Sequence, residues 1–136
     1  MAILSCHWIE SGNTSPCGDI ADWDVSQVTD MANLFCHDDT SSRCDSTRSN
    51  FDGAGISNWD VSGVTDMSKM FYGATGFTED ISTWDVRNVR TFQAAFDGNA
   101  ASAADICTIA SIYDLWGENE NFAYGLDNWI QTTDAE

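Results

Sequence analysis

One phrase of sixteen residues recurs three times in this chain and constrains its fold more than any other feature. The copies occupy residues 20–35, 56–71 and 81–96, and they align without a gap. Each copy begins with Ile-x-x-Trp-Asp-Val and ends in Phe. A unit repeated in this way cannot bury its apolar face alone and must stack on its neighbours. The repetition therefore predicts a stack of similar units.

The two parts of the phrase predict different secondary structures. The Ile-x-x-Trp-Asp-Val part is β-branched and aromatic, which is typical of a short strand that turns at the aspartate. The second part has apolar residues at i, i+3 and i+4, which is typical of one or two helical turns. We therefore expect an α/β repeat solenoid in which the short strands form one small parallel sheet. We also expect the recurrent Trp23, Trp59 and Trp84 to form a ladder in the core.

The 136 residues suffice for one domain with a core of its own, residues 1–136. Residues 122–129 match residues 77–84 in their apolar positions, which predicts a fourth, partial repeat. The predicted order is an N-terminal cap (1–17), repeat 1 with an insertion (18–50), repeat 2 (51–76), repeat 3 (77–96), an insertion with a buried capping helix (97–121), and a partial repeat 4 with a tail (122–136).

The charge of the chain limits the classes of partner. Twenty-two acidic residues face five basic ones, for a formal net charge of −17. Such a surface repels phosphate backbones and anionic lipids, so we expect no nucleic-acid partner and no membrane insertion. No apolar run approaches the ~20 residues that a membrane span needs, and the first residues lack the basic and apolar regions of a signal peptide. The charge favours cationic partners, divalent metal ions or a saline environment.

Four of the five cysteines fall into two close pairs, Cys6 with Cys17 and Cys36 with Cys44. Both pairs lie in polar stretches suited to loops, which predicts local disulfides formed in an oxidising compartment. Cys107 lies in an apolar segment and is predicted to be a buried thiol. A zinc site built from the Cys-His pairs at 6–7 and 36–37 is the less favoured interpretation, because adjacent ligands rarely reach one metal together.

The phrase resembles the repeat of the BspA-like leucine-rich-repeat surface proteins, whose ~25-residue unit carries Trp-Asp-Val-Ser-x-Val-Thr-x-Met-x-x-Met-Phe. Residues 23–31 and 59–67 match that unit almost letter for letter, whereas the third copy has Arg87, Arg90 and Phe92 in place of Ser, Thr and Met. The resemblance implies a short, right-handed, leucine-rich-repeat-like coil capped at both ends. It also implies a cell-surface protein of the adhesion or protein-binding type, without catalytic activity.

One aspartate per repeat forms a column, Asp24, Asp60 and Asp85. If the units stack at strand spacing, these carboxylates repel one another by roughly 3 kcal/mol per neighbouring pair, so something must offset the repulsion. Side-chain to backbone hydrogen bonds within each turn are the favoured interpretation. A column of calcium ions is the alternative, although the chain has no Asp-x-Asp-x-Asp-Gly loop. Apart from that alternative, we expect no cofactor.

The polar positions that differ between copies are the candidate binding residues. They are the strand-side positions Ala21, Asp22, Ser57, Asn58, Ser82 and Thr83, together with the variable Arg87 and Arg90. The chain lacks the sequence motifs of nucleophilic, nucleotide-dependent or metal-dependent catalysis, so we expect no enzyme. The expected function is a secreted or cell-surface module that binds a protein or glycan partner, and the charge of the chain favours a cationic one. The alternative is a calcium-dependent structural or matrix protein.

Overall fold

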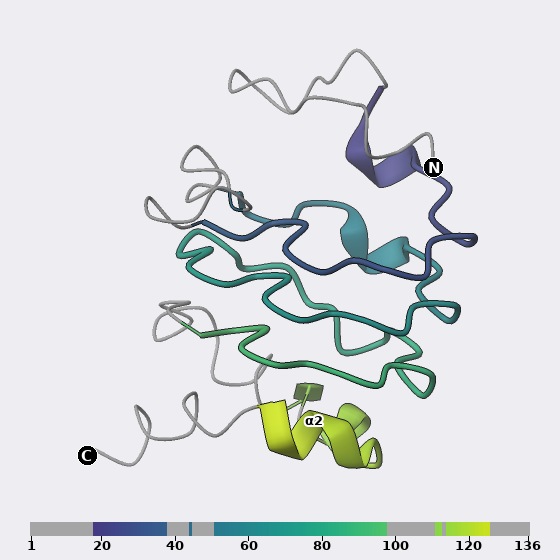
Figure 1. The fold of residues 1–136 in the computed structure, drawn as a ribbon. Coiled ribbons are helices and arrows are strands. Elements are labelled where there is room, and N and C mark those ends of the chain that lie inside the picture. Colours follow the sequence, from purple (N-terminus) through teal and green to yellow (C-terminus); the bar gives the residue numbers. More distant parts are fainter. Residues whose placement is uncertain (1–17, 38–43, 45–50, 98–110, 113, 126–136) are drawn as a thin grey trace.

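The computed structural model describes residues 18–37, 44, 51–97, 111–112 and 114–125. Three elements have defined bounds in this part: the 3-10 helices η2 (Ile20–Asp22) and η4 (Ile56–Asn58), and the α-helix α2 (Glu120–Gly125). Residues 111–112 and 114–116 are also helical. The three copies of the phrase form successive layers, and α2 lies beyond the third layer (Figure 1). None of the helices in these ranges is both long and apolar enough to span a bilayer.

The predicted α/β solenoid with a parallel sheet is wrong. The ranges that the structure describes contain no strand, and the layers are linked there by isolated parallel bridges, Asp30 with Asp66 and Asp66 with Thr91. The Ile-x-x-Trp part is a tight turn in each copy, because the tryptophan N–H donates to the isoleucine carbonyl three residues earlier. The N···O distances are 3.3 Å for Trp23 to Ile20, 3.0 Å for Trp59 to Ile56 and 3.1 Å for Trp84 to Ile81.

The second half of the phrase is not a helix. One residue in each copy has a left-handed backbone, with φ of 61° at Asn33, 54° at Lys69 and 54° at Ala94. A residue in this region interrupts a right-handed helix and an extended strand alike. The apolar residues at i and i+3 instead close turns, as where the Met70 N–H donates to the Met67 carbonyl at 3.2 Å.

Hydrogen bonds between the layers follow a regular register along this interrupted backbone. Every second N–H of one layer donates to a carbonyl of the next layer. From the first layer to the second, the donors at 31, 33 and 35 reach the acceptors at 66, 68 and 70; from the second to the third, the donors at 67, 69 and 71 reach the acceptors at 91, 93 and 95. The N···O distances run from 2.8 to 3.0 Å. The backbone is thus paired between layers without forming a strand.

Aromatic side chains stack through the core in rows. The predicted tryptophan ladder is confirmed: neighbouring ring centroids of Trp23, Trp59 and Trp84 lie 6.5 Å apart, with interplanar angles of 11° and 3°. The row continues with Trp116, 6.3 Å from Trp84 and tilted by 11°. Phenylalanines 35, 71 and 96 form a second row, with centroids 5.7 and 5.5 Å apart. Trp116 and Phe71 of these rows are among the largest fully buried side chains.

The predicted disulfide between Cys36 and Cys44 is confirmed, with Cα atoms 5.0 Å apart. This bond also removes Cys36 from any zinc site. Cys6, Cys17 and Cys107, the N-terminal cap at 1–17, and the tail with Trp129 lie outside the described residues. Phe122, predicted to begin the partial repeat, is buried in α2 with its ring edge-on to Phe92 and Trp116, at centroid distances of 5.2 and 5.3 Å.

Candidate binding site

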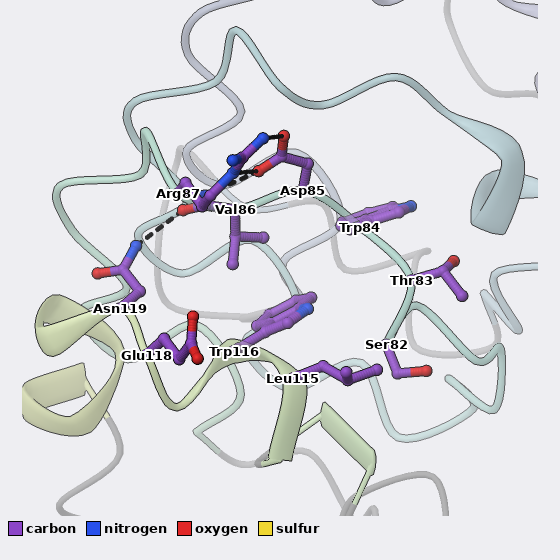
Figure 2. Close-up of a pocket in the computed structure, with 10 residues that line it drawn as sticks. All are labelled: Ser82, Thr83, Trp84, Asp85, Val86, Arg87, Leu115, Trp116, Glu118 and Asn119. Carbon is purple, nitrogen blue, oxygen red and sulfur yellow. Dashed lines mark hydrogen bonds and ion pairs between the residues drawn. The ribbon is translucent and has the colours of Figure 1, made fainter.

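A groove of about 490 Å³ opens where the third layer meets the segment before α2. Figure 2 shows residues of the third layer along one side and residues of the C-terminal segment along the other. The described residues that line it are Ser82, Thr83, Trp84, Asp85, Val86, Arg87, Leu115, Trp116, Glu118 and Asn119. A concave surface with apolar walls and a few polar groups is the usual form of a binding site.

The stacked indoles of Trp84 and Trp116 give the groove a rigid apolar wall. The Nε1–H of Trp84 donates to the Ile56 carbonyl at 3.0 Å, and that of Trp59 donates to the Ile20 carbonyl at 2.9 Å. The first and fourth rings of the row, Trp23 and Trp116, depart from this pattern, because neither indole N–H has an acceptor among the described residues. Trp116 is only 1% exposed, and its indole nitrogen has no hydrogen-bond partner within the part of the chain that the structure describes. A buried donor without an acceptor carries a desolvation penalty.

Asn119 fastens the C-terminal segment to the third layer. Its Nδ2 donates to the Val86 carbonyl at 2.7 Å and to the Val89 carbonyl at 3.0 Å, and the first of these bonds is drawn in Figure 2. Its Oδ1 accepts the backbone N–H of Asn121 at 3.0 Å, at the start of α2. The Asn119 side chain thus ties the C-terminal segment to the third layer, and Asn121 Nδ2 adds a bond to the same Val89 carbonyl at 3.4 Å.

An ion pair forms the exposed rim of the groove. The Arg87 guanidinium donates to both carboxylate oxygens of Asp85, at 2.8 and 2.7 Å (Figure 2). This hydrogen bonding holds the pKa of Asp85 at about 2, with smaller contributions from the Arg87 backbone N–H and charge, and it raises the pKa of Arg87. The Arg87 side chain is 86% exposed, so the pair adds little stability.

The aspartate column is explained by turns. In each layer the column aspartate accepts the backbone N–H two residues later, at 3.0 Å for Asp24, 3.1 Å for Asp60 and 3.2 Å for Asp85. In the first two layers the serine hydroxyl at that later position donates as well, at 2.6 Å, and this hydrogen bond is the main cause of the lowered pKa of Asp24 and Asp60. The favoured interpretation of the column is therefore confirmed. Within the described residues, no three His, Cys, Asp or Glu side chains are grouped to hold a metal ion.

The structure brings some of the predicted binding residues together and separates others. Three lie at the groove: Thr83 and Arg87 are exposed, whereas Ser82 is only 5% exposed. The matching residues of the earlier layers, 21–22 and 57–58, lie in η2 and η4 and do not line the groove. Arg90 is exposed away from it, and its backbone N–H donates to the Thr65 carbonyl at 2.8 Å.

The side of the groove formed by residues 115–119 was not predicted from the sequence, because these residues lie in the segment that was expected to contain a buried capping helix. Leu115 in this segment is 61% exposed and is the one exposed large hydrophobic side chain within the described ranges. Glu118 is exposed beside it, and Asp114 and Glu120 are exposed close by in the sequence. Gly117 could have indicated this part of the site, because a glycine after an apolar run favours a turn over a continuing buried helix.

These features define a class of protein: a small stack of repeated turns around aromatic rows, with a groove at the end of the described stack. The family model described as "Mycoplasma protein of unknown function, DUF285" matches residues 38–133. Because the match covers more than half of the chain, this protein belongs to the DUF285 family. Neither a curated protein nor a solved structure matches the chain.

Proposed function

We propose that this protein is a non-enzymatic binding module of the adhesion or interaction type, and that the groove between residues 82–87 and 115–119 is its contact site. The single observation that carries the proposal is the exposed Leu115 beside the wall of Trp84 and Trp116. Leu115 places an exposed apolar group at a concave surface, and ligand sites are typically concave with apolar lining and a few polar groups. The rigid stack beneath the groove supports the proposal, because a preorganised surface loses little entropy on binding.

We place this module outside the cell or on its surface. The disulfide between Cys36 and Cys44 favours an oxidising compartment. The resemblance of residues 23–31 and 59–67 to BspA-like repeats favours a surface protein of the same type. The net charge of −17 disfavours nucleic acid and anionic membranes as the partner and favours a protein or glycan with a cationic region.

A comparison of two variants tests this proposal. The immobilised protein captures its partner from a surface fraction of the source organism, and Leu115→Asp is expected to release that partner. Asn58→Asp is the matched control, because it adds the same charge at an exposed residue of η4 outside the groove. Release by the Asn58 substitution but not by the Leu115 substitution would place the contact on the second layer and refute the groove as the site.

A further inference from the structure

The Ile-x-x-Trp turn of each of the first two layers is covered by the turn of the next layer. The groove lies beside the third such turn, where this arrangement ends. The η2 turn of the first layer packs closely against the second layer, since a Cβ atom at Gly55 would clash with the Ala21 Cβ. The second layer is joined to the third in the same region, where the Gly55 N–H donates to Glu79 Oε1 at 3.3 Å. Next to the corresponding turn of the third layer, Ser82 and Thr83 line open space instead.

This position favours a polypeptide over a glycan as the occupant. The space next to the first-layer turn is occupied by the second-layer turn, which contains the buried Ile56. The space next to the second-layer turn is occupied by the third-layer turn, which contains the buried Ile81. The groove retains the apolar wall of tryptophans for such a side chain, with Leu115 at its edge.

The charges of the groove favour a basic occupant. Its three charged residues are Asp85, Arg87 and Glu118. Asp85 and Arg87 neutralise each other in their ion pair, which leaves the exposed Glu118 as the net charge. Asp114 is exposed close to it in the sequence, and the whole chain attracts cations through its charge of −17.

From these observations we propose that the groove binds a polypeptide segment in which an apolar side chain is followed closely by lysine or arginine. The apolar side chain packs against Leu115 and the tryptophan wall, and the basic group lies next to Glu118. This inference rests on the proposed function and specifies the chemistry of the partner.

Panning a displayed library of short random peptides against the intact protein tests the inference. The expected result is enrichment of sequences that pair an apolar residue with a neighbouring basic one, and the loss of this enrichment with Leu115→Asp. Enrichment of acidic sequences, of sequences without an apolar residue, or of none at all would overturn the proposal.

A synthetic peptide from the enriched set then measures the role of the charge. Glu118→Gln is expected to weaken its binding by about 2- to 5-fold at low salt, which is the usual size of an exposed ion pair. Glu120→Gln is the matched control, because Glu120 is exposed but does not line the groove, and it is expected to leave the affinity unchanged. Equal effects of the two substitutions would show that only overall charge attracts the peptide, against the assignment of Glu118.

The two proposals fail in different ways. If Leu115→Asp releases the surface partner but no peptide of this kind binds, the groove is the contact site and the polypeptide assignment is wrong. Binding of a glycan array that is lost with the same variant would lead to the same conclusion. If Leu115→Asp leaves the captured partner in place, the proposed function itself fails at this site.

Discussion

At the residue scale, aspartate recurs as a turn residue in the layers that the structure describes. Besides the column at 24, 60 and 85, the carboxylates of Asp19, Asp30, Asp52, Asp66 and Asp80 each accept the backbone N–H two residues later, at 2.8 to 3.0 Å. This contact is the Asx turn, which replaces a backbone hydrogen bond by a side-chain one. The structure therefore gives the acidic composition a local cause, since each layer needs several such turns.

Removal of Arg87 is expected to raise the pKa of Asp85. In the native protein this pKa is about 2, below the ordinary 3.8, because the Arg87 side chain hydrogen-bonds the carboxylate. Arg87→Ala should return the value part of the way toward 3.8, since the backbone N–H of residue 87 still donates. Carboxyl titration by NMR measures the change, with Arg90→Ala as a control that leaves Asp85 unaffected.

The lowered pKa of Asp85 also determines how the stability of the fold changes with pH. Because the folded pKa of Asp85 lies below its unfolded value, its contribution to stability is present above about pH 4 and is lost as the pH falls toward about 2. Asp24, Asp60 and Asp80, whose pKa values are also lowered by hydrogen bonds, act in the same direction. Because the pair is exposed, we expect Arg87→Ala to lower the denaturant midpoint only slightly at pH 7 and by less at pH 2.5. A larger loss at pH 2.5 than at pH 7 would contradict this direction.

The left-handed residue of the third layer offers a stabilising substitution. Ala94 has a φ of 54°, where a Cβ atom clashes with the backbone and glycine does not. Ala94→Gly should raise the free energy of unfolding by roughly 0.5–1 kcal/mol after allowance for the greater freedom of glycine in the unfolded chain. Urea denaturation measures this value. The neighbouring Ala95→Gly removes a buried methyl group and should instead lower stability by roughly 1.5 kcal/mol.

At the scale of the elements, the row of tryptophans keeps the same ring geometry from the first layer to the segment beyond the third. The rings stack in the same orientation through four positions, although the fourth comes from a segment with no sequence similarity to the repeat. The Nε1–H groups of Trp59 and Trp84 pair with carbonyls of the preceding layer, whereas that of Trp116 does not. Ring packing is thus common to all four tryptophans of the row, whereas the hydrogen bond of the indole N–H is made by only some of them.

Replacing each buried tryptophan by phenylalanine separates these two contributions. Trp59→Phe, Trp84→Phe and Trp116→Phe remove the same volume from the core. The first two also remove a hydrogen bond, so they should lower stability by about 1 kcal/mol more than Trp116→Phe, which removes an unpaired donor. Thermal and urea denaturation of the three variants measure the differences. A loss for Trp116→Phe as large as for the other two would show that its N–H is paired in solution.

At the scale of the whole molecule, the charge of −17 and the column of aspartates raise the question of calcium. The column carboxylates already accept backbone N–H groups in their own turns. We therefore expect micromolar calcium to leave the Tm unchanged relative to the same concentration of magnesium. A ligand that binds only the folded state raises the Tm by mass action, so a calcium-specific rise would favour a calcium-dependent structural protein instead.

A thiol count tests the redox assignment of the whole chain. The bond between Cys36 and Cys44 leaves Cys6, Cys17 and Cys107 to be assigned. One free thiol in the unfolded, unreduced protein is expected if Cys6 and Cys17 also pair as predicted, and three free thiols are expected if they do not. Five free thiols in protein isolated from its natural source would argue against an oxidising compartment and against the proposed location.

The amino-acid sequence by itself determined the three stacked units, the tryptophan row, the aspartate turns and one disulfide. These features depend on identical residues recurring at matched positions, or on two cysteines close in sequence, and both can be read from the chain. The form of the backbone could not be read in this way, because apolar residues three apart fit a helix and a tight turn equally well. The hydrogen bonds between layers, with the left-handed residues at 33, 69 and 94, decided in favour of turns.

Only the tertiary structure decided where the groove lies. Trp116 completes the row from outside the repeat because stacking requires a ring at the right place and no particular local sequence. Asn119 then holds that segment against Val86 and Val89, and the remaining space beside Ser82 and Thr83 becomes the groove. A site formed between a repeat and an unrelated segment depends on contacts distant in sequence, and no local pattern records those contacts.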